Sequence, residues 1–172
     1  AGQSYGAAFI PYDLSQETYT PLLWLFEGFT SYYDDLALVR SGVITPADYL
    51  GLLAKTITQV HKGSGRLKQS VAESSFDAWT KYYRQDENAA NAIVSYYTKG
   101  ALIALALDLH LRLHTEGATS LDDVMCRLWK DWQATGEGVP EDGIEHVAQQ
   151  ESGLDLSSFF NTAIRGTQDL DL

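Results

Sequence analysis

The sequence lacks the features that mark several classes of protein. Its 172 residues include one cysteine, Cys126, so an intramolecular disulfide and a thiolate metal cluster are both excluded. No stretch approaches the roughly 18 uninterrupted apolar residues of a membrane-spanning helix. Residues 1–9 also lack the basic start and apolar run of a signal peptide. We therefore expect no membrane association, and we interpret Cys126 as a buried, unreactive thiol.

Basic residues are scarce as well. Twelve Lys and Arg stand against 23 Asp and Glu, which gives a formal net charge of −11. Because an acidic surface repels phosphate backbones, we expect no nucleic-acid partner. Hydrophobic residues make up 45% of the chain and charged residues 20%, a composition typical of a globular domain with its own core.

What the sequence does contain is a set of residues that typically start and end helices. Proline or an N-capping residue precedes several apolar runs of helical period, and glycine follows them. Sustained two-residue alternation, the mark of a strand, is missing. We predict an all-α fold, a helical bundle, that forms a single domain over residues 8–172 after a lead segment at residues 1–7. The expected helices span residues 21–41, 46–62, 76–84, 94–114, 121–135, 140–151 and 156–165, with an exposed basic loop at 63–69.

One charged residue stands in apolar surroundings on the first of these helices. Glu27 follows the run LLWLF and precedes Gly28 and a phenylalanine. Burying an ionised carboxylate without a partner costs several kcal/mol, so Glu27 must be paired, protonated or bound to a metal. Asp34 lies two turns later on the same face, with Thr30 and Ser31 between them. The pattern alone leaves two interpretations open, a solvent-facing polar stripe and a metal ligand at Glu27 with Asp34 orienting another ligand.

The same segment carries a resemblance to a known family. Residues 23–35, LWLFEGFTSYYDD, resemble the signature of the glycyl aminopeptidases, zinc metallopeptidases that belong to the gluzincins together with thermolysin. Residues 69–79 and 95–102 are similar to two further blocks of that family, in the same order and spacing. The resemblance runs from about residue 8 to the C-terminus, and it implies the helical second half of a thermolysin-like catalytic domain.

The resemblance also implies a zinc site and an oxyanion donor. In gluzincins, two histidines of an HExxH helix and a glutamate on a later helix bind Zn²⁺, and that glutamate commonly sits in a Glu-Gly-Phe setting that matches Glu27. An acidic residue seven positions later in related aminopeptidases matches Asp34. A tyrosine of a Tyr-Glu-Lys-Gly element donates a hydrogen bond to the oxyanion; alignment on Lys99 assigns this role to Tyr97, with Tyr96 as the alternative.

Other parts that the family implies are missing from this sequence. No histidine precedes Glu27, so we expect the HExxH segment upstream of residue 1 and a PDZ-like domain after the C-terminus. The implied activity is hydrolysis of an N-terminal glycine or alanine from a peptide substrate. We expect this chain alone to bind Zn²⁺ weakly or not at all and to be inactive. An apolar face around Trp24, Phe26 and Phe29, uncovered by the missing half, is expected to favour self-association.

Two functions of other classes compete with this interpretation. The chain could be a non-catalytic helical interaction module that has kept a peptidase scaffold. It could also be a carbohydrate-active protein, in which two carboxylates flank a glycosidic bond. The candidates for that pair are Asp34, Asp35 and Glu73.

The histidines offer a further metal-binding pattern. His110 and His114 have the i, i+4 spacing of a chelating pair, but no glutamate base follows the first of them. Because helix C-termini favour cationic histidine, we predict a structural role for this pair, and likewise for His61 and His146.

Overall fold

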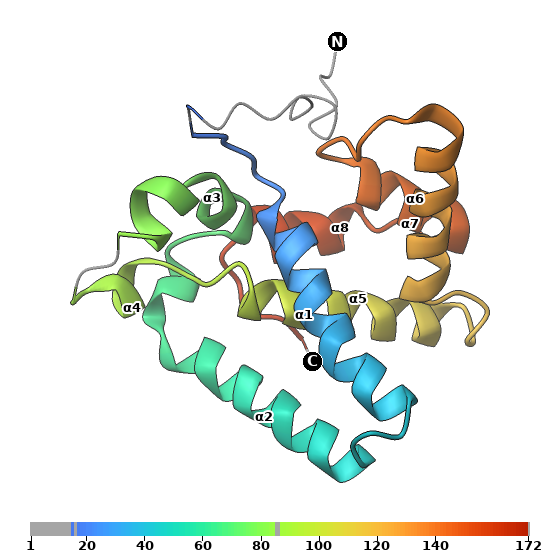
Figure 1. Cartoon of the computed structure of the whole chain (residues 1–172), viewed down its shortest axis with the longest axis horizontal. Helices are drawn as coiled ribbons and strands as arrows, with labels where there is room; N and C mark the ends of the chain where they lie inside the picture. Colours follow the sequence, from blue (N-terminus) through green and yellow to red (C-terminus); the bar gives the residue numbers. More distant parts are fainter. Residues whose placement is uncertain (1–14, 16, 85–86, 172) are drawn as a thin grey trace.

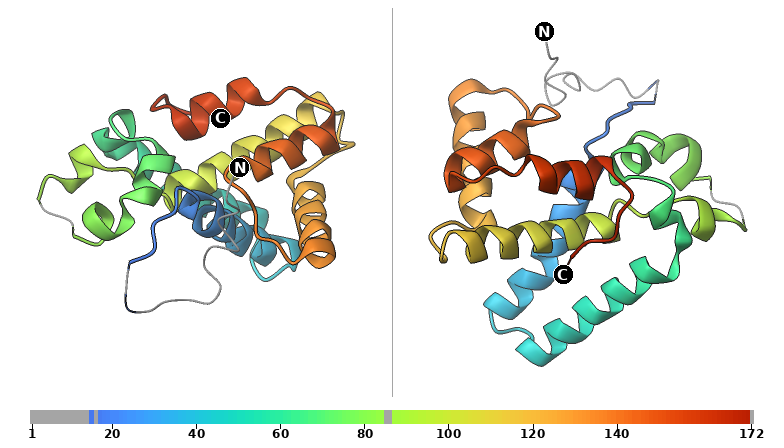
Figure 2. Two further views of the ribbon diagram at one scale, coloured as in Figure 1. Left: turned by 90° about the horizontal axis from the view of Figure 1, so that it is seen from above. Right: turned by 180° about the vertical axis from the view of Figure 1, so that it is seen from behind.

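Two long helices, α1 (Leu23–Arg40) and α5 (Thr98–His114), cross at the centre of the computed structural model, which describes residues 15, 17–84 and 87–171 (Figure 1). α5 is predominantly apolar, and most of its residues from Lys99 to Asp108 are buried, as its composition predicts. Seen from above in Figure 2, α1 lies on one side of α5 and the C-terminal helical segment lies on the other. α5 is therefore the core element on which the other helices pack.

The remaining helices surround this pair. α2 (Pro46–Lys62) returns from the end of α1 and has no fully buried residue, so it is a peripheral helix. Among the described residues there is no strand, and the predicted all-α fold is confirmed. The other elements are α3 (Val71–Phe76), α4 (Ala89–Ala92), α6 (Leu121–Thr135), α7 (Gly143–Ser152) and α8 (Ser157–Phe160), with a 3₁₀ turn η2 (Ser64–Leu67) and π-helical turns η3 (Ala78–Tyr82) and η4 (Asn161–Arg165).

Helix starts with strong capping signals lie where the sequence predicts them. Thr45 and Asp48 form a capping box at the start of α2, and Ser120 and Asp123 form one at α6. The helix expected at 76–84 is shorter than predicted, because only the π-helical turn η3 lies within that range. Ser70 and Glu73 cap an earlier helix, α3, and only a π-helical turn follows it.

The start of α5 and the loop before α3 also differ from expectation. α5 begins at Thr98 rather than near Val94, because the backbone of Val94 bonds instead to the side chains of Gln69 (3.2 Å) and Ser74. The loop at 63–69 is only partly exposed. Gly65 is buried against the backbone of Ile93, where an added Cβ would lie 2.0 Å from the carbonyl oxygen.

The apolar face expected around Trp24 and Phe29 is not exposed. Both rings lie in the core, 5.9 Å apart in an edge-to-face arrangement, and only Phe26 is exposed, at 42%. The expectation is therefore wrong for Trp24 and Phe29, because α5 and α3 cover the face of α1 that carries them. Cys126 was expected to be buried and is exposed on α6.

Two other expectations concern the N-terminal residues and membrane-spanning helices. The proposed lead segment at residues 1–7 lies outside the described residues. None of the described helices has the length and apolar character that crossing a membrane requires.

Candidate functional site

The candidate site lies where α1 and α5 cross at two glycines. A Cβ added to Gly28 would lie 2.6 Å from the Cα and carbonyl carbon of Gly100, and one added to Gly100 would lie 2.7 Å from the carbonyl oxygen of Trp24. Real Cβ atoms do not approach a backbone so closely, so the crossing requires glycine on both helices. It thereby brings Glu27 and Tyr97, far apart in sequence, to the same part of the fold.

Glu27 is half-buried on α1, one residue before the crossing. Within the described part of the chain its carboxylate forms no ion pair and accepts no hydrogen bond, while its backbone carbonyl oxygen accepts one from the hydroxyl of Ser31 at 2.8 Å. A half-buried carboxylate whose oxygens have no partner in the described residues is free to bind a metal ion.

Only some of the side chains in the polar stripe predicted on α1 are available to bind other groups. Thr30 and Ser31 donate their hydroxyl hydrogens to carbonyl oxygens of their own helix, four residues back. Asp34 is exposed, two turns from Glu27 on the same face. Of this stripe, therefore, Glu27 and Asp34 remain available to bind other groups.

Tyr97 and Tyr96, the two candidate oxyanion donors, have different surroundings at the start of α5. Tyr96 is 1% exposed, and its hydroxyl donates to that of Tyr83 at 3.4 Å. Tyr97 is only half-buried. The two rings lie 4.8 Å apart, and the ring of Tyr82 lies 6.1 Å from that of Tyr97. Tilted aromatic rings thus pack against Tyr97 while leaving part of it accessible.

The negative charge of Glu27 affects the pKa of the Tyr97 hydroxyl. Burial, followed by the hydroxyl of Tyr83 and the negative charge of Glu27, raises the pKa of Tyr97 to about 12. Burial also raises the pKa of Tyr96. The carboxylate of Glu27 is therefore near enough to the Tyr97 hydroxyl to disfavour the phenolate.

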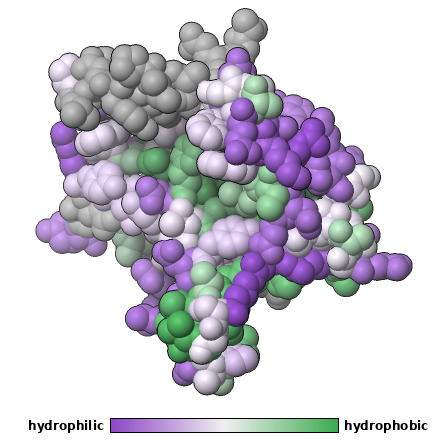
Figure 3. Space-filling view, turned by 45° about the vertical axis from the view of Figure 1, so that its right-hand side comes forward, coloured by the Kyte–Doolittle hydropathy of each residue, from purple (hydrophilic) through white to green (hydrophobic). Residues whose placement is uncertain are grey.

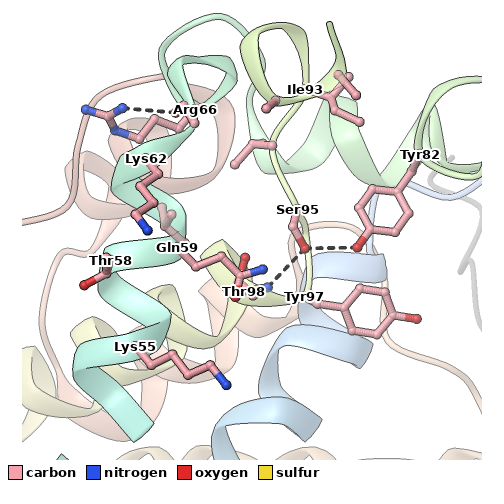
Figure 4. A pocket seen from close by; sticks show the side chains of 15 residues that line it. Lys55, Thr58, Gln59, Lys62, Arg66, Tyr82, Ile93, Ser95, Tyr97 and Thr98 are labelled. Carbon is pink, nitrogen blue, oxygen red and sulfur yellow. Dashed lines mark hydrogen bonds between the residues drawn. The ribbon is translucent and has the colours of Figure 1, made fainter. Parts of the chain in front are cut away.

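One wall of an adjoining groove is formed by Tyr97. This groove, with a volume of about 620 Å³, lies between α2 and residues 89–98 (Figure 4). Ser95 supports its floor by bonding both the hydroxyl of Tyr82 (3.2 Å) and the backbone N–H of Thr98 (3.3 Å). This groove was not predicted from the sequence, although Lys55, Gln59 and Lys62 have the spacing of one helix face and could have indicated it.

A complete zinc site is not formed by the residues that the structure describes. Catalytic Zn²⁺ is held by three protein ligands and a water, whereas no three His, Cys, Asp or Glu residues of the described ranges are grouped as a metal site would require. Glu27, half-buried and without a competing cation, fits one such ligand.

The other candidate residues take structural roles. The rings of His110 and His114 stack at 4.0 Å, and Nδ1 of His114 lies 2.9 Å from the carbonyl oxygen of His110. Glu73, proposed as one of a carbohydrate-cleaving pair, uses its carboxylate to accept hydrogen bonds from the backbone and hydroxyl of Ser70 (2.9 and 3.0 Å). It is therefore a helix cap, which leaves the carbohydrate interpretation without its second carboxylate.

The chain is similar to a crystal structure of an aminopeptidase N family protein from Idiomarina loihiensis, with 48% sequence identity and a TM-score of 0.92. The match covers 96% of this chain but only 28% of that protein, so the chain spans less than a third of its relative's length. A comparison with curated proteins gives no match.

The sequence model of the M61 glycyl aminopeptidases matches residues 4–103, a range that includes Glu27, Asp34 and Tyr97. This match covers more than half of the 172 residues. The chain belongs to the M61 glycyl aminopeptidase family.

Proposed function

We propose that this chain is the part of a zinc-dependent aminopeptidase that supplies one metal ligand, Glu27, and the oxyanion-stabilising hydroxyl of Tyr97. The observation that carries the proposal is the half-buried carboxylate of Glu27, without a cationic partner in the described part of the chain, whose charge raises the pKa of Tyr97. The two histidine ligands and the general base would come from an HExxH segment outside this sequence.

The chemistry of the two side chains suits these roles. When bound, Zn²⁺ polarises a scissile carbonyl group and lowers the pKa of a bound water. A tyrosine with a pKa of about 12 keeps its proton throughout the neutral range, so Tyr97 can donate a hydrogen bond to an oxygen that becomes negative. Burial and the nearby charge of Glu27 disfavour the phenolate, so Tyr97 acts as a donor rather than a base.

Accessibility favours Tyr97 over Tyr96 in this role. Tyr96 is 1% exposed, and its hydroxyl is already bonded to Tyr83. Tyr97 retains exposed surface at the edge of the groove. We assign Asp34 to orient a histidine ligand, since it lies two turns from Glu27 on the same exposed face of α1. The substrate would be a peptide with N-terminal glycine or alanine.

The test needs the polypeptide encoded together with the sequence upstream of residue 1. We expect stoichiometric zinc by elemental analysis and release of glycine from glycine 4-nitroanilide. Glu27→Gln should remove most of the zinc and the activity. Tyr97→Phe should retain the zinc and lower kcat by about 10²–10³, the effect of losing one oxyanion donor. Glu137→Gln, at an exposed glutamate after α6, is the matched control and should behave as wild type.

Several outcomes would contradict the proposal. Full zinc content in Glu27→Gln would remove Glu27 from the metal site. An unchanged kcat in Tyr97→Phe, with a large loss in Tyr96→Phe, would move the donor to Tyr96. If the longer polypeptide has no HExxH segment, binds no zinc and is inactive, that result would instead support the non-catalytic helical module.

For the 172-residue chain by itself we predict no tight zinc binding and no peptidase activity, because one carboxylate cannot fill a tetrahedral site. Calorimetric titration with Zn²⁺ checks this prediction. Stoichiometric submicromolar binding that is lost in Glu27→Gln would show that the chain carries a complete metal site.

A further inference from the structure

The groove beside Tyr97 has a charge opposite to that of the chain as a whole. Its lining includes Lys55, Lys62 and Arg66 but no aspartate or glutamate, in a chain with a net charge of −11 (Figure 4). The remaining lining residues are apolar, small or neutral polar. A basic groove on an acidic chain attracts anionic ligands while the rest of the surface repels them.

The three cations of the groove are not equivalent. Arg66 is neutralised by Asp169, with 2.7 Å between Nε and Oδ1, and in Figure 4 its guanidinium turns away from the groove. Lys55 and Lys62 have no ion pair or hydrogen bond in the described part of the chain. By contrast, five of the six arginines form ion pairs with carboxylates. The groove therefore carries two uncompensated positive charges.

Helical geometry places these charges along the length of the groove. Lys55, Gln59 and Lys62 all line the groove from α2, and in Figure 4 Lys55 and Gln59 extend towards the segment that carries Ser95 and Thr98. Seven residues of helix advance about 10.5 Å, which is the length of roughly three residues of extended peptide. The volume of about 620 Å³ is also that of a site for a short peptide.

We propose that this groove binds the acidic side chains of a peptide substrate, with Lys55 and Lys62 as their charge partners. The inference rests on the proposed function, because Tyr97 is both the proposed oxyanion donor and a wall of the groove. A peptide whose N-terminal residue is at the zinc site would reach the groove with the residues that follow it. The enzyme would then favour substrates with Asp or Glu after the N-terminal residue.

Binding to the 172-residue chain tests this without any metal. Fluorescence polarisation compares C-terminally labelled Gly-Ala-Glu-Glu-Ala with its Gln-Gln counterpart at low salt. We expect the acidic peptide to bind about fivefold tighter, the contribution of two exposed ion pairs, and this preference to fall as salt rises. Lys55→Gln combined with Lys62→Gln should remove the preference. Lys130→Gln, at an exposed lysine on α6, should retain it. Both changes lie on exposed helix faces, and circular dichroism confirms that the variants are folded.

The possible failures are distinguishable. Equal binding of the two peptides, or an unchanged preference in the double variant, overturns the groove proposal. Displacement of the acidic peptide by inorganic phosphate or a DNA oligonucleotide at equal concentration overturns it too, because the groove would then bind any anion. Hydrolysis that depends on Glu27 without an acidic preference leaves the proposed function intact. An acidic preference in a protein that never hydrolyses peptides overturns the proposed function instead.

Discussion

Lys99 is a buried cation that ties two segments to the start of α5. It is 1% exposed, and its Nζ lies 3.5 Å from the carbonyl oxygens of Arg66 and Gln168. Burial lowers the pKa of its ammonium group. Because Tyr97 lies two residues before Lys99 and Arg66 lies at the groove, this lysine links the candidate site to the C-terminal segment.

His110 gives a pH dependence at the scale of a single residue. Burial, followed by the charge of His114, lowers the pKa of His110 below 6.5. Between the lowered value and 6.5 the unfolded chain binds more protons than the folded protein, so stability is lost as the pH falls through this window. We predict that His110→Asn reduces the drop in the urea midpoint between pH 7.5 and 5.5. His61→Asn, at an exposed site on α2, should keep the wild-type slope. An identical slope in His110→Asn would contradict the prediction.

At the scale of elements, the fold depends on how closely α1 approaches α5. Trp24, Gly28 and Gly100 form a contact in which backbone meets backbone. The N–H of Trp24 also donates to the hydroxyl of Ser75 at 2.9 Å, which attaches α3 to the first turn of α1. Both interactions hold the segment that carries Glu27 against the start of α5.

We predict that Gly28→Ala destabilises the protein by about 1–3 kcal/mol, the usual cost of overpacking a core contact. Gly51→Ala is the matched control. Gly51 lies in the middle of α2, with nothing within 4 Å of an added Cβ, so alanine should stabilise the helix by up to about 1 kcal/mol. Urea unfolding measures both variants. Equal effects of the two substitutions would show that the crossing is looser than the structure indicates.

At the scale of the whole molecule, exposed apolar side chains gather on the hairpin of α1 and α2. Figure 3 shows this hydrophobic surface where the hairpin projects from the lower end of the molecule. Val43 is 71% exposed and Leu50 60%. Such a surface favours association, whereas the net charge of −11 opposes it through repulsion between copies.

We therefore predict concentration-dependent self-association that increases with salt, because salt screens the repulsion. Light scattering from 50 to 500 mM NaCl checks this prediction. A reducing agent is required, since the exposed Cys126 could form intermolecular disulfides. Val43→Lys with Leu50→Lys should restore the monomer. A wild-type chain that remains monomeric at high salt and high concentration would rule out self-association through this surface.

The sequence by itself determined the features that depend on consecutive residues. The capping boxes at Thr45 and Ser120 fix the starts of α2 and α6, because side chain and backbone lie within one turn. The apolar composition of α5 identifies it as the central helix. Glu27 and Tyr97 were found through motifs that also contain Gly28 and Gly100. The close contact between these two glycines explains why the motifs occur together.

Only the tertiary structure decided which faces of these helices are covered. Trp24 and Phe29 were expected to be uncovered by the missing half of the catalytic domain, but α5 and α3 pack on that side of α1 and bury both rings. The diversion of the Val94 backbone depends on tertiary hydrogen bonds to the side chains of Gln69 and Ser74, whereas the Ser70–Glu73 capping box is a local signal that the sequence already contained. The basic groove arises in the same way: its lysines and Tyr97 are more than thirty residues apart, and only the packing of α2 beside α5 brings them together.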